Sequence, residues 1–460
     1  MKTIVEPKEH IEKLWGKQRI RDDITYRMMQ YVLRVEHNGI VLLHNVVTGR
    51  LVVLDKEETV VVKKLPQKYE PVMEQLVADH YLVPDDYDEH QQVANLRSVL
   101  LKLNKDSGTV PIVGYTILPT TACNARCYYC FEKGSRVATM SEETAEAVVA
   151  FIVNHCDDNK RVFITWFGGE PTVAAKRIDQ ICEGLQANDI RYASKIITNG
   201  YLLDESMITR ASELWHLRGA QICVDGTEQS YNKAKAYVAI SDNPYQRVMR
   251  NIGALLQHNI KVGLRMNFDL DNWQEFKDVI HESIARFGKD ERLTISAHPV
   301  IGSHKNHDGK LSHGSDEWFD EKTAEMMHYA REVGVCKKLI QLPFLNYEIC
   351  SACNEKTVTI TPEGWLVRCP EKYGSDQITG NVVTGVTNRE LVDAWKQIAD
   401  FSFCHECEFF PNCVRLVNCS NTTYCHKRKD YLLQCEAAIK HHLGVFEKGA
   451  MHNGVSGAQS

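Results

Sequence analysis

From residue 111 onward, short apolar segments alternate with amphipathic helical segments, and this alternation restricts the fold more than any other feature. Six segments are predicted to be strands: GYTILP (114–119), RVFITWF (161–167), KIITNG (195–200), AQICVDG (220–226), VGLRMNF (262–268) and LTISAHPV (293–300). All are apolar and largely β-branched, as expected of strands that are buried on both faces. Helices are predicted between them, one capped by Ser141 and another opened by Asn243 and Pro244. The series predicts an α/β fold with a parallel barrel or partial barrel, whose functional site lies at the carboxyl ends of the strands.

Sixteen cysteines in a chain of 460 residues point to metal ligands. The N-terminal stretch MKTIVEPKEHIEKLWGKQ is charged and no apolar run is long enough to span a membrane, so we expect a cytoplasmic protein without a membrane partner. Thiols stay reduced in that compartment, which argues against a disulfide framework. A formal net charge of -6 gives no general basic character, so no nucleic-acid partner is expected.

The cysteines form two groups along the chain. Three stand in the stretch CNARCYYC, directly after the first predicted strand, at Cys123, Cys127 and Cys130. The second group has nine members: Cys350, Cys353, Cys369, Cys404, Cys407, Cys413, Cys419, Cys425 and Cys435. The other four, Cys156, Cys182, Cys223 and Cys336, are isolated and are interpreted as small buried packing residues.

Three thiolates in one loop suit an iron-sulfur cluster better than a zinc ion. In a cluster of four irons each iron takes one external ligand, so three cysteines leave one iron open to a substrate or cofactor. A structural zinc site is the alternative, but it normally has a fourth Cys or His at hand, and none stands within this stretch of sequence. The position after the first strand is also where a barrel of this kind builds its site.

The stretch CNARCYYC resembles the signature of radical S-adenosylmethionine (radical SAM) enzymes, in which Cys-x3-Cys-x2-Cys holds a four-iron cluster and an aromatic residue, here Tyr129, precedes the last cysteine. The resemblance implies a partial (β/α)6 TIM-like barrel and two cofactors, a [4Fe-4S] cluster and S-adenosylmethionine. In that family the amino and carboxylate groups of S-adenosylmethionine chelate the open iron. One-electron cleavage of the sulfonium then gives a 5′-deoxyadenosyl radical, which abstracts hydrogen from the substrate.

The second predicted strand ends in WFGGEP, which matches the family's Gly-Gly-Glu-Pro motif at Gly168, Gly169, Glu170 and Pro171. Glycines let the backbone approach a ligand closely, and a glutamate accepts hydrogen bonds from an ammonium group. The resemblance also implies contacts with the ribose and carboxylate of S-adenosylmethionine, from Asn199, Asp225 and Arg265. An Asn or Asp at a strand end is also a common turn former or helix cap, which is the alternative for these residues.

The second cysteine group resembles the SPASM domain, which extends many radical SAM enzymes and holds two auxiliary four-iron clusters. Its spacing is seen in Cys353-x10-Gly364-x4-Cys369, which encloses a hairpin predicted to turn at 362–364. The sequence departs from the usual spacing after Cys413. The family commonly has three residues and then another cysteine there, whereas here five residues separate Cys413 from Cys419. We assign one auxiliary cluster to Cys350, Cys353, Cys369 and Cys419 and the other to Cys404, Cys407, Cys413 and Cys435, with Cys425 as a spare or in place of Cys435. A pair of zinc knuckles is the alternative.

The N-terminal residues are predicted to form a small module of strands and helices. A meander over 31–54, with turns at Asn38-Gly39 and Thr48-Gly49, precedes helices at 57–66 and 69–83. The module resembles the winged-helix-like element of ribosomal-peptide biosynthesis that captures the leader of a precursor peptide as an added strand. The strand GRLVVLD (49–55) is expected at a sheet edge that accepts the leader, and Lys56, Lys63 and Lys64 would favour an acidic one.

The expected layout has six parts: a peptide-binding module (1–95), a linker (96–110), the radical SAM barrel (111–310), a bridging helical region (311–349), the SPASM domain (350–435) and a C-terminal tail (436–460). These resemblances imply a peptide maturase that acts on a ribosomally made precursor, receives electrons from a flavodoxin or ferredoxin and forms a thioether between a sulfur and a carbon. The alternatives are a sulfatase-maturing dehydrogenase, a carbon-carbon or carbon-oxygen cross-linking maturase, and a non-catalytic scaffold, against which the intact motifs count. In sulfatase-maturing relatives a carboxylate base follows the cysteine that closes the hairpin. Here Pro370 follows Cys369, so that catalytic role falls to Glu371 or to no residue.

Overall fold

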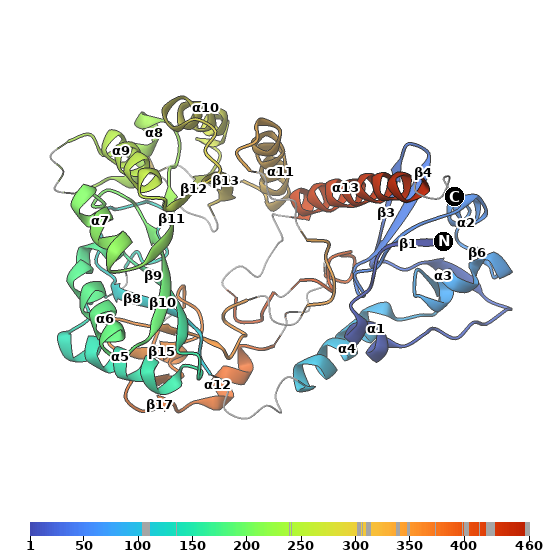
Figure 1. Cartoon of the computed structure of the whole chain (residues 1–460), viewed down its shortest axis with the longest axis horizontal. Coiled ribbons are helices and arrows are strands. Elements are labelled where there is room, and N and C mark those ends of the chain that lie inside the picture. The colour runs from blue at the N-terminus through green and yellow to red at the C-terminus, as the bar shows by residue number, and fades with distance from the viewer. Residues whose placement is uncertain are drawn as a thin grey trace.

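The structure is a computed structural model of the whole chain. It describes residues 1–103, 111–134, 136–238, 240, 242–300, 305, 307–309, 314–336, 341–346, 350–372, 374–397, 399, 404–413, 415–419 and 428–455. None of the helices in these ranges is both long and apolar enough to cross a membrane. Figure 1 shows the N-terminal module at one end and a curved sheet with helices at the other.

Six parallel strands form the predicted barrel sheet and follow one another in sequence order. They are β8 (Gly114–Thr120), β9 (Arg161–Gly168), β10 (Arg191–Thr198), β11 (Leu217–Cys223), β12 (Lys261–Phe268) and β13 (Leu293–Pro299). All six predicted strands are confirmed, although β10 already begins at Arg191 and β11 already begins at Leu217.

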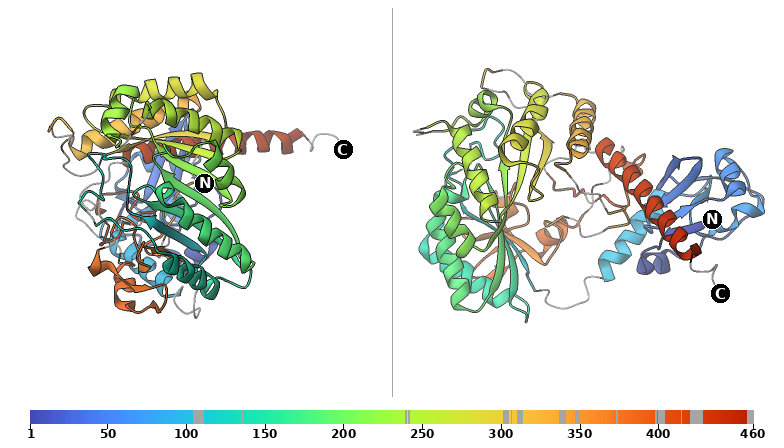
Figure 2. Two further views of the ribbon diagram at one scale, coloured as in Figure 1. Left: turned by 90° about the vertical axis from the view of Figure 1, so that its left-hand side faces the viewer. Right: turned by 45° about the horizontal axis from the view of Figure 1, so that its top comes forward.

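Helices cover the outer face of this sheet, as Figures 1 and 2 both show. They are α5 (Glu142–His155), α6 (Ala175–Ala187), α7 (Glu205–Glu213), α8 (Glu228–Lys235), α9 (Pro244–Gln257) and α10 (Phe276–Phe287). Two predicted helix starts are confirmed: Ser141 accepts a hydrogen bond from the Thr144 N–H at 3.1 Å, and Asn243 accepts one from the Gln246 N–H at 3.3 Å.

The inner face of the sheet is open, contrary to the expectation that the strands are buried on both faces. Along β9, Val162 and Trp166 are buried beneath the helices, whereas Phe163 is 42% exposed on the other face. Burial alternates in the same way along β10 and β13. The reason is that β13 ends the sheet without pairing with β8, so the barrel is only partial and its lumen is not closed.

The cysteine-rich segment extends this sheet at its other end. Strand β14 (Thr357–Ile360) pairs with β8 in parallel and with β15 (Trp365–Val367) in antiparallel orientation. The predicted hairpin is thereby confirmed, and Gly364 in its turn has a φ of 82°, which glycine adopts readily. Two short strands, β16 (Gly380–Asn381) and β17 (Gly385–Val386), complete the sheet.

The N-terminal module contains two antiparallel sheets and four helices. One sheet has the order β1 (Lys2–Val5), β5 (Leu51–Val53), β4 (Ile40–Asn45), β3 (Val32–His37), and the other has the order β6 (Gln67–Lys68), β2 (Thr25–Met28), β7 (Leu82–Pro84). The helices are α1 (Glu9–Trp15), α2 (Lys56–Lys63), α3 (Glu74–Ala78) and α4 (Glu89–Leu103). The expectation that GRLVVLD lies at an edge is wrong, because β5 lies between β1 and β4.

Two helix predictions in this module also change. The helix predicted over 69–83 is limited to a 3-10 turn (Pro71–Met73) and α3, because His80 has a φ of 57° and redirects the chain into β7. Helix α4 runs through the boundary expected at residue 95, and its residues Leu96 and Leu100 belong to the core of the module. The module therefore extends to the end of α4.

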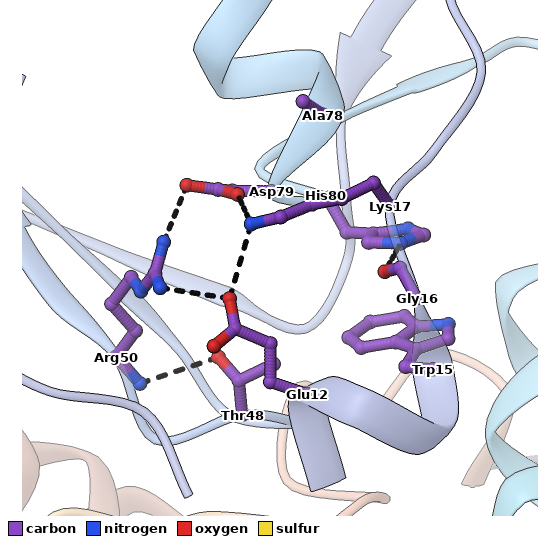
Figure 3. Close-up of a pocket in the computed structure, with 9 residues that line it drawn as sticks. All are labelled: Glu12, Trp15, Gly16, Lys17, Thr48, Arg50, Ala78, Asp79 and His80. Atoms are coloured by element: carbon purple, nitrogen blue, oxygen red, sulfur yellow. Dashed lines mark hydrogen bonds and ion pairs between the residues drawn. The ribbon is translucent and has the colours of Figure 1, made fainter. Parts of the chain in front are cut away.

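A set of ion pairs around the buried Asp79 joins three elements of the module (Figure 3). Asp79, at the end of α3, binds Lys17 and also binds Arg50 at 2.5 Å, and Arg50 in turn binds Glu12 of α1 at 2.8 Å. The cavity beside these residues has a volume of about 10 Å³, which accommodates one water molecule at most. This cluster therefore stabilises the module and does not form a ligand site.

The C-terminal helix packs against the N-terminal module. Helix α13 (Arg428–Val455) contacts β1 and β3 of the module and also contacts α11 (Asp316–Val333) of the bridging region. The tail expected over 436–460 is thus helical as far as Val455. One hydrophobic core contains Leu33 of the module together with Phe410 and Ile439, so the module and the C-terminal segment share their interior.

Candidate active site

The cysteine loop leaves β8 at the carboxyl end of the barrel sheet, where the barrel topology predicts it. Cys123, Cys127 and Cys130 are all partly buried. Asn199, which follows β10, donates a hydrogen bond to Asn124 Oδ1 at 2.7 Å. On the opposite side, the Arg126 N–H donates to the carbonyl at the end of α8 at 2.8 Å. Two neighbouring elements therefore hold the loop in place.

The donor set of this loop fits an iron-sulfur cluster. Burial raises the pKa of the Cys123 thiol to about 12 and that of Cys127 to about 11, so a bound cation is needed to keep these sulfurs as thiolates at neutral pH. Within the described ranges, no three His, Cys, Asp or Glu side chains converge closely enough to hold a single metal ion. Three soft thiolate donors in one loop are a ligand set that an iron-sulfur cluster takes.

The two glycines of the Gly-Gly-Glu-Pro stretch allow β9 to end directly against the cysteine loop. The Gly169 N–H donates to Thr120 O at 3.1 Å. A β-carbon added at Gly168 would lie 2.3 Å from Thr120 O, and one added at Gly169 would lie 2.4 Å from Thr121 O. The close approach that glycine permits here is thus to the backbone of the cysteine loop itself.

Glu170 is fully buried and joins the ends of β9 and β10. Its carboxylate accepts hydrogen bonds from the Thr172 N–H at 3.1 Å, from the Thr198 hydroxyl at 2.7 Å and from the Asn199 N–H at 2.8 Å. Burial raises the pKa of Glu170, and these donors act in the opposite direction. Contact with a ligand ammonium group therefore stays a prediction. Pro171 is buried and begins a short 3-10 helix.

Asp225 is the centre of a buried network after β11. Its carboxylate accepts hydrogen bonds from the Tyr129 hydroxyl, from the Lys235 ammonium at 2.8 Å and from both N–H groups of Asn267 at 3.0 Å. Lys235 also donates to the Tyr129 hydroxyl at 2.8 Å. Asp225 therefore fixes the aromatic residue before Cys130, and a direct contact with the ribose of a ligand would displace one of these donors.

Lys235, Asn267 and Cys223 also belong to this site, although sequence reasoning did not assign them. Lys235 is one of several charged residues near the end of α8, so nothing in the sequence distinguishes it. Cys223 interacts electrostatically with Cys127, so it is not the isolated packing residue that we expected. Arg265, the predicted ligand contact, donates to Asn267 Oδ1 at 3.0 Å and so supports the same network.

Part of the second cysteine group gathers in one place. Cys350, Cys353, Cys369 and Cys419 surround a small apolar core. Cys404 and Cys435 are buried in the core shared with the N-terminal module, where Cys407 packs at the border, and Cys413 interacts electrostatically with Tyr431 of α13. Cys425 lies outside the described residues. Glu371 is exposed on the turn after Cys369, so its side chain faces solvent in this structure.

Comparison with known proteins agrees with this geometry. The family model described as Radical SAM superfamily matches residues 117–282. Radical SAM cyclopropyl synthase TigE of Paramaledivibacter caminithermalis is 20% identical over 366 residues, which cover 72% of this chain and 71% of that protein.

Solved structures share the fold. The structure of native anSMEcpe with bound AdoMet and Cp18Cys peptide is 16% identical, has a TM-score of 0.56 and covers 74% of this chain and 100% of that one. Streptococcus suis SuiB bound to S-adenosylmethionine is 14% identical, has a TM-score of 0.50 and covers 86% and 95% of the two chains. The matched residues include both the cysteine loop and the Gly-Gly-Glu-Pro stretch, so residues 117–282 form a domain of the radical SAM superfamily, and such a domain implies a [4Fe-4S] cluster and S-adenosylmethionine.

Proposed function

We propose that this radical SAM enzyme matures a ribosomally synthesised precursor peptide by taking a hydrogen atom from a peptide carbon and joining that carbon to a cysteine sulfur, whose proton is released while the remaining electron passes to an auxiliary cluster. The observation that carries the proposal is the open inner face of the barrel sheet, which runs from the amino ends of the strands toward the cysteine loop at their carboxyl ends. Phe163 and Lys195 are both exposed on it, with Lys195 Nζ 5.9 Å from the centroid of the Phe163 ring. An open face of this kind suits a chain of several residues, whereas small molecules are usually enclosed.

The solved structure of anSMEcpe supports a peptide substrate, because it holds a bound peptide together with AdoMet. The proposed chemistry divides between the cofactors and the chain. When bound, the cluster and S-adenosylmethionine supply one-electron chemistry that yields a carbon radical able to take a hydrogen atom. Cys123, Cys127 and Cys130 would hold the cluster. Tyr129, tied to the buried Asp225, would keep one wall of the site rigid.

We also assign the two auxiliary cysteine sets to [4Fe-4S] clusters, which makes three clusters per chain. The support is that Cys350, Cys353, Cys369 and Cys419 come together around one small core although Cys419 is far from the others in sequence. A flavodoxin or ferredoxin in the cytoplasm would supply the electrons.

We assign leader recognition to the N-terminal module, with the accepting edge at β3. Strand β3 is one of the two edges of its sheet, and Arg34 and Glu36 on it are exposed. The Asn38-Gly39 turn makes His37 and Ile40 a hydrogen-bonded pair, so the N–H of Glu36 faces the free edge. Backbone groups at such an edge can pair with an extended peptide.

A carbon-carbon bond is the second candidate for the product, favoured by the name of the curated relative, a cyclopropyl synthase. Co-expression with the short open reading frames beside the gene, followed by mass spectrometry before and after alkylation with iodoacetamide, tests both. A thioether lowers the mass by a pair of hydrogens and removes one alkylatable thiol, whereas a carbon-carbon bond lowers the mass equally and leaves the thiols. An aldehyde trapped by a hydrazine reagent would indicate sulfatase-type oxidation instead. The matched control replaces Cys123, Cys127 and Cys130 by Ala and should leave every peptide unmodified.

A further inference from the structure

Arg368 is a buried cation inside the cysteine-rich segment. It follows β15, and its side chain is enclosed, with 6% of the residue exposed. Its guanidinium donates to four backbone carbonyls: Ala352 O at 2.9 Å, Thr357 O at 2.7 Å, Ser351 O at 3.2 Å and Asn354 O at 2.6 Å. One side chain thereby closes the loop that begins the second cysteine group, but none of these partners carries a charge.

No carboxylate forms an ion pair with Arg368 in the described part of the chain. The acidic residue that interacts with it electrostatically, Glu355, is bound to Lys396 and lies 3.2 Å from Arg389. An arginine in a protein keeps its charge, so a buried one calls for a negative partner.

This cation binds the loop that carries two of the cysteines, because its partners Ser351 and Ala352 lie between Cys350 and Cys353. Cys369 is its neighbour in the chain, and Cys350, Cys353 and Cys419 gather with Cys369 around the same small core. As thiols they supply no negative charge. As the four ligands of a [4Fe-4S] cluster they form a group that is a net anion in both of its oxidation states. That anion would complete the environment of Arg368.

We propose that Arg368 is a positioning residue for the auxiliary cluster held by these four cysteines. The charge of Arg368 favours the reduced cluster, and its hydrogen bonds fix the loop that carries two of the ligands, Cys350 and Cys353. The inference rests on the assignment of an auxiliary cluster under the proposed function. A nearby buried cation stabilises the additional electron, because reduction makes the cluster more negative.

The test is a redox titration of the full-length chain, followed by electron paramagnetic resonance. In a background with Cys123, Cys127 and Cys130 replaced by Ala, only auxiliary clusters contribute to the signal. Three further variants are compared in it: Arg368→Gln, which removes the charge, Arg368→Lys, which keeps it, and Arg389→Gln, a matched control. Arg389 also interacts with Glu355, but its side chain is 66% exposed.

We expect Arg368→Gln to lower the equilibrium constant for reduction of one auxiliary cluster about tenfold, a shift of about 59 mV toward more negative potential. Arg368→Lys and Arg389→Gln should stay near the background value. Equal shifts in Arg368→Lys and Arg368→Gln, or no shift in Arg368→Gln, would overturn the inference. If Arg368→Gln does not retain iron, the result for Arg368→Lys decides whether the inference holds. A tenfold change in the equilibrium constant for reduction in Arg368→Lys, which keeps the charge, would contradict a role of that charge. A background protein without any cluster would instead refute the auxiliary assignment, whatever Arg368 does.

Discussion

The Lys235 ammonium lies 2.8 Å from the Asp225 carboxylate, and the two side chains are 3% and 0% exposed. Both contact the Tyr129 hydroxyl. The carbonyl of Lys235 also accepts the Arg126 N–H at 2.8 Å. A helix end, a strand end and the cysteine loop thus meet in one buried ion pair, which holds the loop between its second and third cysteines.

Replacing Lys235 by Met should destabilise the fold by about 3–5 kcal/mol, because it leaves the Asp225 charge buried without its partner. The cysteine loop should loosen, and the protein should lose most of the iron of the triad cluster. Iron analysis and urea denaturation measure both effects. The matched control is Lys233→Met on the same helix, whose side chain is 53% exposed and should matter little.

The double variant Asp225→Asn, Lys235→Met tests the same pair from the other side. Removing both charges should recover more than half of the stability that Lys235→Met loses, since no unpaired buried charge remains. If the double variant is as unstable as the sum of the single variants, the two residues act independently and the ion pair is not what holds the loop.

Gly169→Ala should displace the cysteine loop, because its new β-carbon would lie 2.4 Å from Thr121 O and 2.5 Å from Ala122 O. Backbone atoms cannot move aside as the end of a flexible side chain can. We therefore expect the free energy of unfolding to fall by about 1–3 kcal/mol and the three cysteines to bind iron poorly. The control is Gly263→Ala on β12 of the same sheet, where the nearest contact, Thr294 Oγ1 at 3.7 Å, is ordinary. Full iron content and unchanged S-adenosylmethionine cleavage in Gly169→Ala would show that the glycine serves another purpose.

Buried His44 should make the N-terminal module sensitive to acid. Burial lowers its pKa from 6.5 to about 4, and its Nε2–H donates to Pro343 O at 2.8 Å. The unfolded chain protonates His44 near pH 6.5, whereas the folded chain protonates it only near pH 4. The free energy of unfolding therefore has its full value above pH 6.5 and falls as the pH drops from 6.5 toward 4. Hydrogen exchange of β4 amides should show a loss of about 2 kcal/mol between pH 7 and pH 5. In His44→Gln the pH dependence of the same amides should largely disappear.

The barrel was predictable because its signals are local. The strand at 161–167 is a run of mostly apolar, β-branched and aromatic residues, and Ser141 and Asn243 mark helix starts by side-chain chemistry that acts within one turn. The cysteine triad was predictable for the same reason, since its three ligands lie within eight residues of sequence.

What sequence reasoning missed depends on contacts between distant segments. The strand at 51–53 was predicted to lie at a sheet edge, but β1 from the start of the chain pairs with it and makes it internal. The two ends of the Lys235 and Asp225 pair belong to a helix and a strand end that only the barrel brings together. The openness of the inner face depends on whether β13 reaches β8, which no single segment encodes.

Deleting the N-terminal module is not a clean test of leader recognition, because the module is part of the cysteine-rich interior. Arg97 of α4 donates to the backbone carbonyls of Phe410 and Pro411, and Cys435 is buried in the shared core. Deleting residues 1–103 should therefore expose that core, and we expect aggregation and loss of iron near Cys404. Intact iron content and solubility after the deletion would contradict the shared core.

A single substitution at the sheet edge separates recognition from folding. Glu36→Pro removes the N–H that faces the free edge of β3 and is tolerated sterically at an edge strand. We expect affinity for the leader, measured by titration of the labelled peptide, to fall at least about tenfold, which corresponds to about 1.4 kcal/mol of lost backbone pairing. Cleavage of S-adenosylmethionine without peptide should not change, because the cysteine loop lies in the barrel. Lys2→Pro at the opposite edge, β1, is the matched control. If Lys2→Pro weakens leader binding and Glu36→Pro does not, the leader pairs with β1, and if neither does, the module recognises the peptide in another way or not at all.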